Sequence, residues 1–292
     1  MKAVSRTVDD VLACPRCHAA FRRIDGKLEC RSDACGFRAE IREDIVCALE
    51  SETGASFFDS HFPVMMHGSD EPGARAAFYD QQERLLAERL ERATVVLDVG
   101  CGPRLPYKRP THALVLGVER SYESLRQNVD VDVRLFASAT RLPIQSRSVD
   151  AIVCFYSLHH LVGASTQENE HLVRGALNQF ARVLSPGGHL VVFEVSPWFV
   201  FDRAQRAVWN ACRRGLGDAL DMFFWHHAKL DRLVAEHFPA GAVGEYRPLR
   251  IPHFTTFPPV FALQRLRIPR MLYPFHIGMH TWRMPSSVTR SK

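Results

Sequence analysis

The sequence contains no long apolar run, internal repeat, low-complexity segment or dense run of lysine and arginine. No segment approaches the roughly 18 to 20 apolar residues that span a bilayer. Met1 to Arg6 lead into no apolar signal core. We therefore expect a cytoplasmic protein. The formal charge of +5 is mild for 292 residues, so a nucleic-acid partner is permitted but not required.

The composition is that of a globular protein. Hydrophobic residues make up 46% of the chain and charged residues 24%. A chain of this length can bury a sizeable core, as one large domain or as one domain with a small appendage.

Four of the eight cysteines form two close pairs near the start of the chain, at Cys14, Cys17, Cys30 and Cys35. This C-x2-C and C-x4-C spacing predicts a tetrahedral structural zinc site, because so short a segment has little core of its own. A disulfide framework and a redox C-x-x-C are the alternatives. His18 directly follows a ligand and is interpreted as a bystander. The remaining cysteines lie in apolar settings and are expected in the core: Cys47, Cys101, Cys154 and Cys212.

Residues 94–102 predict a buried strand that ends in a tight turn, because an apolar, largely β-branched run stops at Gly100 and Gly102. Glycines allow the backbone to approach a ligand closely. A second strand, residues 113–119, ends in Glu119 at a spacing suited to a ribose. By themselves these features also allow a dinucleotide-dependent dehydrogenase.

Four linked segments between residues 94 and 195 resemble the class I S-adenosylmethionine-dependent methyltransferases: VLDVGCG, LGVERS, ASATRLPIQSRSVDAIVCFYSLHHL and ARVLSPGGHLVVFE. The last of these does not occur in the dehydrogenases. The resemblance implies an α/β fold, a Rossmann-like doubly wound sheet of seven strands. S-adenosylmethionine would lie across the carboxyl ends of the first strands.

The resemblance also implies a set of cofactor-binding residues. These are Tyr79, Asp98, Gly100, Gly102, Glu119, Ser138, Ala139 and Phe155. Two positions depart from the family pattern. Ser138 stands where an acid usually holds the adenine, so its hydroxyl or the amide of Ala139 takes that role. Three prolines in residues 103–110 predict a short, irregular first crossover in place of a helix.

The end of the fourth predicted strand, residues 148–156, carries the candidate catalytic residues Tyr156, His159 and His160. Methyl transfer to oxygen or nitrogen benefits from a base, and the ordinary histidine pKa near 6.5 suits this role. A purely structural histidine pair is the alternative. His226 and His227 form a second pair that could serve.

The segment CGFRAEIREDIVCAL resembles the small zinc ribbons that accompany methyltransferases, with residues 37–49 as the last ribbon strand. The predicted layout is a zinc-ribbon domain at 1–50 and a connector with a lid helix at 51–92. The methyltransferase domain follows at 93–267, with a substrate-shaping insert at about 196–228, and a tail at 268–292. We expect the sixth and seventh strands at 242–249 and 259–266.

The most consistent function is methyl transfer from S-adenosylmethionine to an oxygen, nitrogen or carbon atom of a small molecule, such as a secondary metabolite or an isoprenoid-like compound. The aromatic insert favours an apolar acceptor. One alternative is an rRNA guanine methyltransferase whose ribbon binds RNA through Arg22, Arg23, Lys27, Arg31 and Arg38. Another is a non-catalytic cofactor-binding adaptor. The basic and apolar tail could contact a membrane surface, nucleic acid or the back of its own domain.

Overall fold

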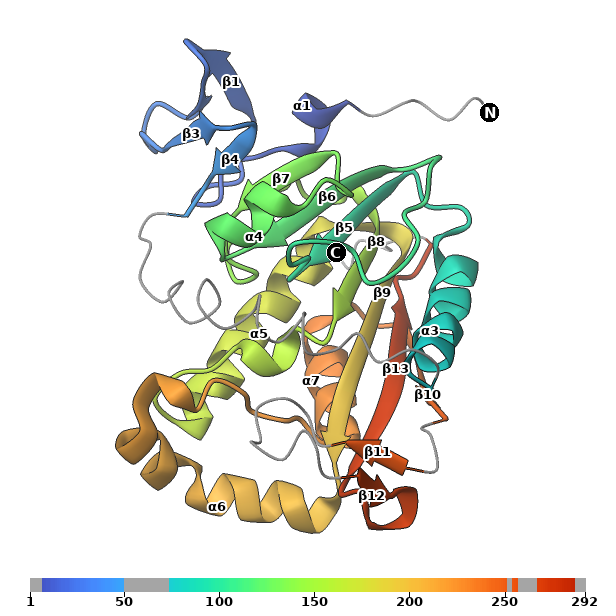
Figure 1. The fold of residues 1–292 in the computed structure, drawn as a ribbon. Helices are drawn as coiled ribbons and strands as arrows, with labels where there is room; N and C mark the ends of the chain where they lie inside the picture. Colours follow the sequence, from blue (N-terminus) through green and yellow to red (C-terminus); the bar gives the residue numbers. More distant parts are fainter. Residues whose placement is uncertain (1–6, 50–73, 251–253, 257–266, 287–292) are drawn as a thin grey trace.

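The computed structural model describes residues 7–49, 74–250, 254–256 and 267–286. One large mixed sheet runs through the molecule, with helices on both of its faces (Figure 1). The seven central strands are, in spatial order, β7 (Val133–Phe136), β6 (Leu114–Glu119), β5 (Val95–Val99), β8 (Val149–Phe155), β9 (Leu184–Pro197), β13 (Phe275–Arg283) and β10 (Val243–Pro248).

Strands β7 to β9 run parallel, whereas β13 is antiparallel to both β9 and β10. The parallel strands are almost continuously apolar because both of their faces are covered. Their carboxyl ends therefore meet at one edge, where a doubly wound sheet places its ligand site. The predicted α/β class is confirmed, and so is the number of strands in its central sheet.

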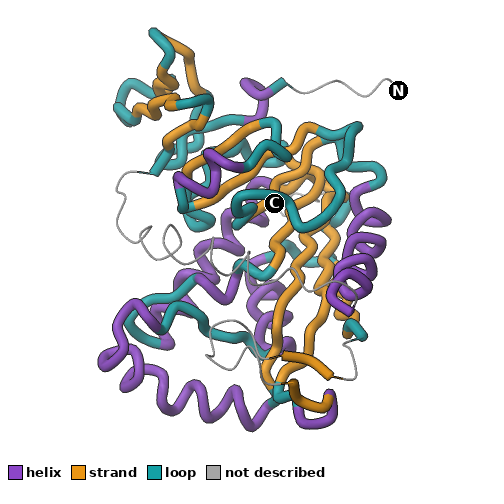
Figure 2. Tube along the Cα trace, in the orientation of Figure 1, coloured by secondary structure: helices purple, strands orange, loops and turns teal. Residues whose placement is uncertain are grey.

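Two core clusters lie on opposite faces of the sheet. The helices are α3 (Ala74–Leu90), α4 (Tyr122–Gln127), α5 (Thr166–Val183), α6 (Phe199–Leu216) and α7 (His227–His237). Helices α5 and α7 pack against one face through Phe180 and Leu233, whereas α3 and α4 cover the other through Leu86 and Leu125. Along the backbone trace, α4 follows β6, α5 follows β8 and α6 follows β9, whereas the connections from β5 to β6 and from β7 to β8 contain no helix (Figure 2).

The first crossover contains no helix. Residues 100–113, between β5 and β6, form turns and bends only. The prediction from the three prolines is therefore confirmed, since each proline removes a hydrogen-bond donor and restricts the residue before it.

The N-terminal segment extends the same sheet. It comprises α1 (Val8–Val11), β1 (Phe21–Ile24), β2 (Lys27–Cys30), β3 (Arg38–Arg42) and β4 (Ile45–Cys47). Strand β4 pairs in parallel with β7, so the N-terminal strands and the seven central strands share one sheet of eleven strands (Figure 1). Residues 37–49 were expected to form a single strand. They form two, because Glu43 and Asp44 adopt positive φ values in a tight turn between β3 and β4.

The seventh strand lies later in the chain than predicted. The predicted strand at 259–266 falls outside the described residues, and the strand between β9 and β10 is β13, inside the predicted tail at 268–292. The sequence of β13 mixes basic and apolar residues and was interpreted as part of a tail. Its centre, from Gly278 to Trp282, is buried in the sheet. The methyltransferase sheet therefore extends beyond residue 267. Strands β11 (Phe254–Thr256) and β12 (Arg267–Pro269) pair antiparallel in a separate two-stranded sheet.

Candidate active site and metal centre

The turn after β5 begins with two glycines in the left-handed region. Gly100 has a φ of +78° and Gly102 a φ of +57°, which other residues rarely adopt. A Cβ on Gly100 would lie 2.5 Å from the Cβ of Ser157, the residue that follows Tyr156 after strand β8. The Ser157 hydroxyl also donates to the Val99 carbonyl at 2.7 Å. The carboxyl ends of β5 and β8 are thereby joined where the glycines allow close packing.

Asp98 is fully buried at the end of β5. Its Oδ2 accepts a hydrogen bond of 2.5 Å from the hydroxyl of Tyr107, which is buried in the proline-rich crossover. Its Oδ1 is buried without a hydrogen-bond partner. Burial raises the pKa of Asp98 to about 7, although the Tyr107 hydroxyl acts in the opposite direction. The contact of Tyr107 with Asp98 was not predicted, because Tyr107 is distinguished in the sequence only as an aromatic residue among prolines and basic residues.

Glu119 ends β6 and faces the glycine turn. Its Oε2 accepts from the Gly102 amide at 3.2 Å, and its Oε1 accepts from the amides of Arg120 and Ser121 at 2.6 and 3.1 Å. Burial raises the pKa of the carboxyl group, and the amides oppose that effect. Glu119 therefore holds the turn, and a ribose would have to share its oxygens with these amides.

The segment after β7 carries the predicted adenine-binding residues. The Ser138 hydroxyl is bonded to the Thr140 hydroxyl at 2.8 Å and accepts from the Thr140 amide, so it stabilises a local turn. Ala139 is buried beside it. The ribbon contacts the next residues directly, since the Ala13 amide donates to the Pro143 carbonyl at 3.0 Å. The residue after Ala13 is the predicted metal ligand Cys14.

Phe155 and Tyr156 occupy the end of β8. Phe155 is buried against Phe193, with ring centroids 4.8 Å apart. Tyr156 has a φ of +55°, a strained conformation for a residue with a side chain. Its hydroxyl donates to Gln82 of α3 at 3.1 Å, which ties the predicted lid helix to the site. The side chain of Tyr79 lies outside the described residues. The buried Gln82 was not predicted, because a glutamine in a polar helix gives no signal.

His159 forms a buried pair with Glu194 of β9. The His159 Nδ1 lies 2.7 Å from the Glu194 Oε2, while Glu194 Oε1 accepts from the Leu158 amide at 2.8 Å. The side chains of His159 and Glu194 are only 7% and 3% exposed. A carboxylate accepts hydrogen bonds, so the tautomer with its proton on Nδ1 suits this contact and leaves Nε2 as the ring nitrogen that can receive a proton. No catalytic role was predicted for Glu194. It reaches His159 only because β9 pairs with β8, and the local sequence does not show that pairing.

His160 occupies the same 3-10 turn, η1 (Leu158–His160), but faces a different acid. Its Nδ1 lies 3.2 Å from the Asp221 carbonyl and 3.5 Å from the Asp221 Oδ2. Burial lowers the pKa of His160 below the usual histidine value, with the neighbouring His159 adding to the effect. The predicted histidine pair is therefore divided between two carboxylates.

The second predicted histidine pair, His226 and His227, makes its ring contacts with residues other than His159 and Glu194. His226 and His227 stack on each other at 4.5 Å, and His227 stacks on Tyr246 of β10 at 4.7 Å. His226 caps α7 by accepting from the Ala228 amide. These contacts give the pair a structural role at the start of α7.

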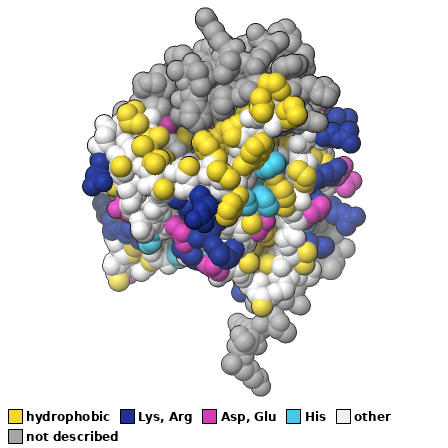
Figure 3. Space-filling view, turned by 90° about the horizontal axis from the view of Figure 1, so that it is seen from below, with side chains coloured by type: hydrophobic (Ala, Val, Ile, Leu, Met, Phe, Trp, Pro, Cys, Tyr) yellow, Lys and Arg dark blue, Asp and Glu magenta, His cyan; other side chains and the backbone are white. Residues whose placement is uncertain are grey.

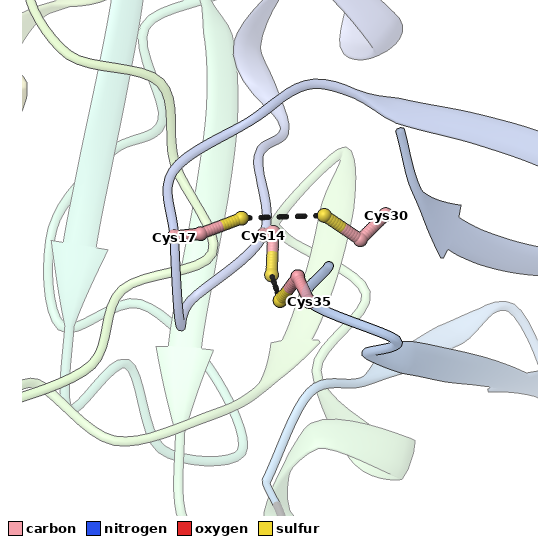
Figure 4. A group of neighbouring side chains, drawn as sticks. All are labelled: Cys14, Cys17, Cys30 and Cys35. Carbon is pink, nitrogen blue, oxygen red and sulfur yellow. Dashed lines mark hydrogen bonds between the residues drawn. The ribbon is translucent and has the colours of Figure 1, made fainter. Parts of the chain in front are cut away.

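The four ribbon cysteines converge on one point (Figure 4). Their sulfur atoms all lie within 4.8 Å of one another, with Cys14 and Cys35 at 3.6 Å and Cys17 and Cys30 at 3.3 Å. These separations greatly exceed a disulfide bond of about 2.05 Å. They approach the spacing of four thiolates around zinc at about 2.3 Å from each sulfur. The cluster is compatible with structural zinc.

The basic residues of the ribbon are largely paired with its own acids. The ion pairs are Arg22 and Arg38 with Glu29, Arg23 with Asp9, and Lys27 with Glu40. The Arg31 Nε donates to the Phe21 carbonyl. Little unbalanced positive charge remains for phosphate binding, so the ribbon gives no support to RNA recognition.

The site residues fit S-adenosylmethionine. Asp98 offers a buried oxygen without a partner, which a cationic ligand would satisfy, and the glycine turn beside it has the conformation of a close ligand approach. The parallel strands place both at the ligand edge of the sheet.

Comparison with known proteins agrees with this class. Residues 97–192 match a family model described as a methyltransferase domain. The solved structure of the cyclase SpnF is 17% identical, with a TM-score of 0.54, over 81% of this chain and 97% of that one. The N-methyltransferase NodS from Bradyrhizobium japonicum, solved with S-adenosyl-L-homocysteine, is 14% identical, with a TM-score of 0.46, over 75% and 91%. A geranyl diphosphate methyltransferase is 14% identical, with a TM-score of 0.48, over 70% and 77%. No curated protein matches the chain.

The family match over residues 97–192 and the sheet order support an S-adenosylmethionine-dependent methyltransferase. Its methyltransferase domain includes residues 97–192, and a four-cysteine cluster precedes it in the chain. Among the described helices, none is both long and apolar enough to cross a membrane.

Proposed function

We propose that the protein methylates an oxygen or nitrogen atom of a small, largely apolar molecule, with His159 as the general base. The observation that carries this proposal is the buried pair of His159 and Glu194. It lies at the carboxyl ends of β8 and β9, beside the glycine turn of β5. A carboxylate that orients a histidine through Nδ1 leaves Nε2 ready to take a proton.

The cofactor supplies an activated methyl group when bound. The residues of the chain then bind, orient and exclude water. We assign Asp98, Gly100, Gly102 and Glu119 to the amino-acid and ribose parts of the cofactor. We assign the adenine part of the cofactor to Ser138, Ala139 and Phe155. Tyr79, on the predicted lid helix, would cover the cofactor. Tyr156, fixed by Gln82, orients the acceptor, and His160 supports the turn that carries His159.

Aromatic packing beside the dyad favours an apolar acceptor. The His159 ring lies 5.5 Å from Phe224, which in turn lies 5.0 Å from Phe275. Met222 and Tyr273 belong to the same buried cluster. A secondary metabolite or isoprenoid-like compound suits these aromatic and apolar side chains. A polyanionic RNA suits the protein less well, because the basic residues of the ribbon are paired with its own acids.

The test is transfer of a labelled methyl group from S-adenosylmethionine into host extract, separated into RNA, protein and organic-soluble fractions. We expect label in the organic fraction. His159→Gln and Glu194→Gln should reduce the rate by about 10²- to 10⁴-fold while leaving cofactor affinity nearly unchanged. His171→Gln, an exposed histidine of α5, is the matched control.

Two results would contradict the proposal. Label confined to RNA would make the ribbon a recognition module and replace the substrate class. Full transfer by both dyad variants would remove His159 from catalysis. Label in no fraction, with S-adenosylmethionine still bound in calorimetric titration, would instead support the cofactor-binding adaptor.

A further inference from the structure

Helix α6 has an apolar outward face as well as a buried inward one. The inward face includes Trp209, which is 2% exposed. On the outward face, Val200 and Val208 are 77% and 52% exposed, and the positions between them include Ala204 and Ala207. Apolar residues on both faces characterise a helix that is covered on both sides. In the described structure, protein covers one side.

The apolar surface continues onto the neighbouring chain segment. The Trp198 amide donates to the Pro274 carbonyl at 2.9 Å, so the start of α6 adjoins the turn η3 (Arg270–Leu272). We define the α6 patch as the exposed residues Trp198, Phe199, Val200, Val208, Leu216, Met271 and Leu272. Hydrophobic side chains gather on the face of the molecule seen from below (Figure 3).

Helix α6 carries more basic than acidic residues. Arg203 and Arg214 are exposed on α6, and the Arg203 guanidinium lies 5.6 Å from the ring centre of the exposed Phe199. The one acid of α6, Asp202, is 8% exposed and bonded to Arg206 at 2.9 Å. On α6, apolar and aromatic side chains therefore lie beside exposed arginines, while the one acid of the helix is buried, and this combination complements an anionic lipid surface.

The α6 patch connects with the proposed catalytic pair through buried aromatic side chains. Phe201, on the first turn of α6, lies 5.1 Å from Phe275. Phe275 lies 5.0 Å from Phe224, and Phe224 lies 5.5 Å from His159. These packed rings join the α6 patch to the region of the proposed base.

We propose that the α6 patch rests on an anionic lipid bilayer and that the acceptor is an amphiphile drawn from that bilayer. The second half of this inference rests on the proposed function, and the first half does not. Binding is peripheral, through one amphipathic helix and the adjoining turn.

The experiment is sedimentation of the full-length protein with vesicles of phosphatidylglycerol and phosphatidylcholine, compared with phosphatidylcholine alone. We expect binding to the anionic vesicles that weakens as salt rises. Val200→Ser with Val208→Ser should weaken it about tenfold, because two apolar side chains lose their burial. Arg203→Gln and Arg214→Gln should each weaken it about fivefold. Val129→Ser replaces a valine that is 83% exposed and lies outside the α6 patch, so it should leave vesicle binding unchanged.

Absence of binding to anionic vesicles overturns the inference, as does binding that Val129→Ser weakens as much as the α6 variants. A stable dimer in solution that Val200→Ser disperses assigns the patch to a second copy of the chain and also overturns it. Vesicle binding is measured without methyl transfer. Binding without transfer therefore contradicts the proposed function and the second half of this inference but leaves the first half standing, and transfer into the organic fraction without binding contradicts this inference alone.

Discussion

The two ends of the large sheet are stabilised in different ways. The ribbon end has strands of three to five residues, and its cysteine cluster lies beside them. The opposite end has the 14-residue β9 and the 9-residue β13, packed against α6, α7 and a dense group of aromatic residues. Val11, Leu28 and Phe37 of the ribbon join the core cluster of the large sheet, and β4 pairs with β7, but the ribbon strands are short, so we expect its four cysteines to add stability by binding a metal. The opposite end depends on apolar burial.

The two ends also contact the candidate active site in different ways. The ribbon reaches the predicted adenine segment through backbone hydrogen bonds, including Gln145 to the Val11 carbonyl at 2.7 Å. The opposite end reaches His159 through side-chain packing at Phe224. Disturbing the ribbon should therefore affect the cofactor, and disturbing the aromatic end should affect the acceptor.

The largest effect is expected from loss of the metal centre. Cys17→Ser should abolish zinc binding and unfold the ribbon, because structural zinc contributes about 10 to 16 kcal/mol in small domains. The cofactor affinity should also fall, since the ribbon contacts Pro143. Zinc content, thermal unfolding and calorimetric titration measure these effects. Cys212→Ser in α6 is the control, and a Cys17→Ser protein with unchanged zinc content and affinity would contradict the comparison.

A core substitution at the aromatic end should have the next largest effect. Trp225 is 2% exposed and stacks edge-on with Phe223 at 5.0 Å. Trp225→Ala should lower the free energy of unfolding by about 3 to 5 kcal/mol, through lost burial and a cavity. Trp198→Ala, at a side chain that is 38% exposed, should cost much less. Urea unfolding measures both, and equal losses would show that this end does not depend on burial.

Asp98, between the two ends, should impose a pH dependence on the cofactor-free protein. Its pKa is about 7 when folded and 3.8 when unfolded, so the folded state favours the protonated form. The stabilisation is complete below pH 4 and is lost as the pH rises towards 7. The difference in free energy of unfolding between wild type and Asp98→Asn should change by roughly 1.4 kcal/mol per pH unit in that range. A constant difference would show that Asp98 is not buried as described.

The smallest effect is expected from a ribbon ion pair. Arg38 contacts Glu29 at 3.0 Å, but its side chain is 70% exposed. Arg38→Gln should change the free energy of unfolding by less than about 1 kcal/mol, because water and salt screen exposed pairs. A larger loss, measured by urea unfolding of the zinc-loaded protein, would mean that charge pairing and not the metal stabilises this end.

Sequence reasoning was most successful where the signal was local. The cysteine spacing predicted the four-residue cluster, the proline content predicted the irregular crossover, and apolar periodicity predicted α5 and the parallel strands. It failed for the seventh strand, since the short apolar and basic runs in residues 259–283 allow more than one strand. The partners of the site residues could not be predicted, because Tyr107, Gln82 and Asp221 carry no distinguishing local pattern.

The sequence by itself determined the class of fold, the thiolate cluster and the order of the methyltransferase motifs, because each depends on spacing within a few tens of residues. Only the tertiary structure decided that β4 continues the sheet at β7, that Tyr107 bonds to Asp98, and that Glu194 orients His159. These contacts depend on the register of strands that are distant in the chain. Pairing between β8 and β9 brings Glu194 beside His159, and no local pattern of residues contains that register.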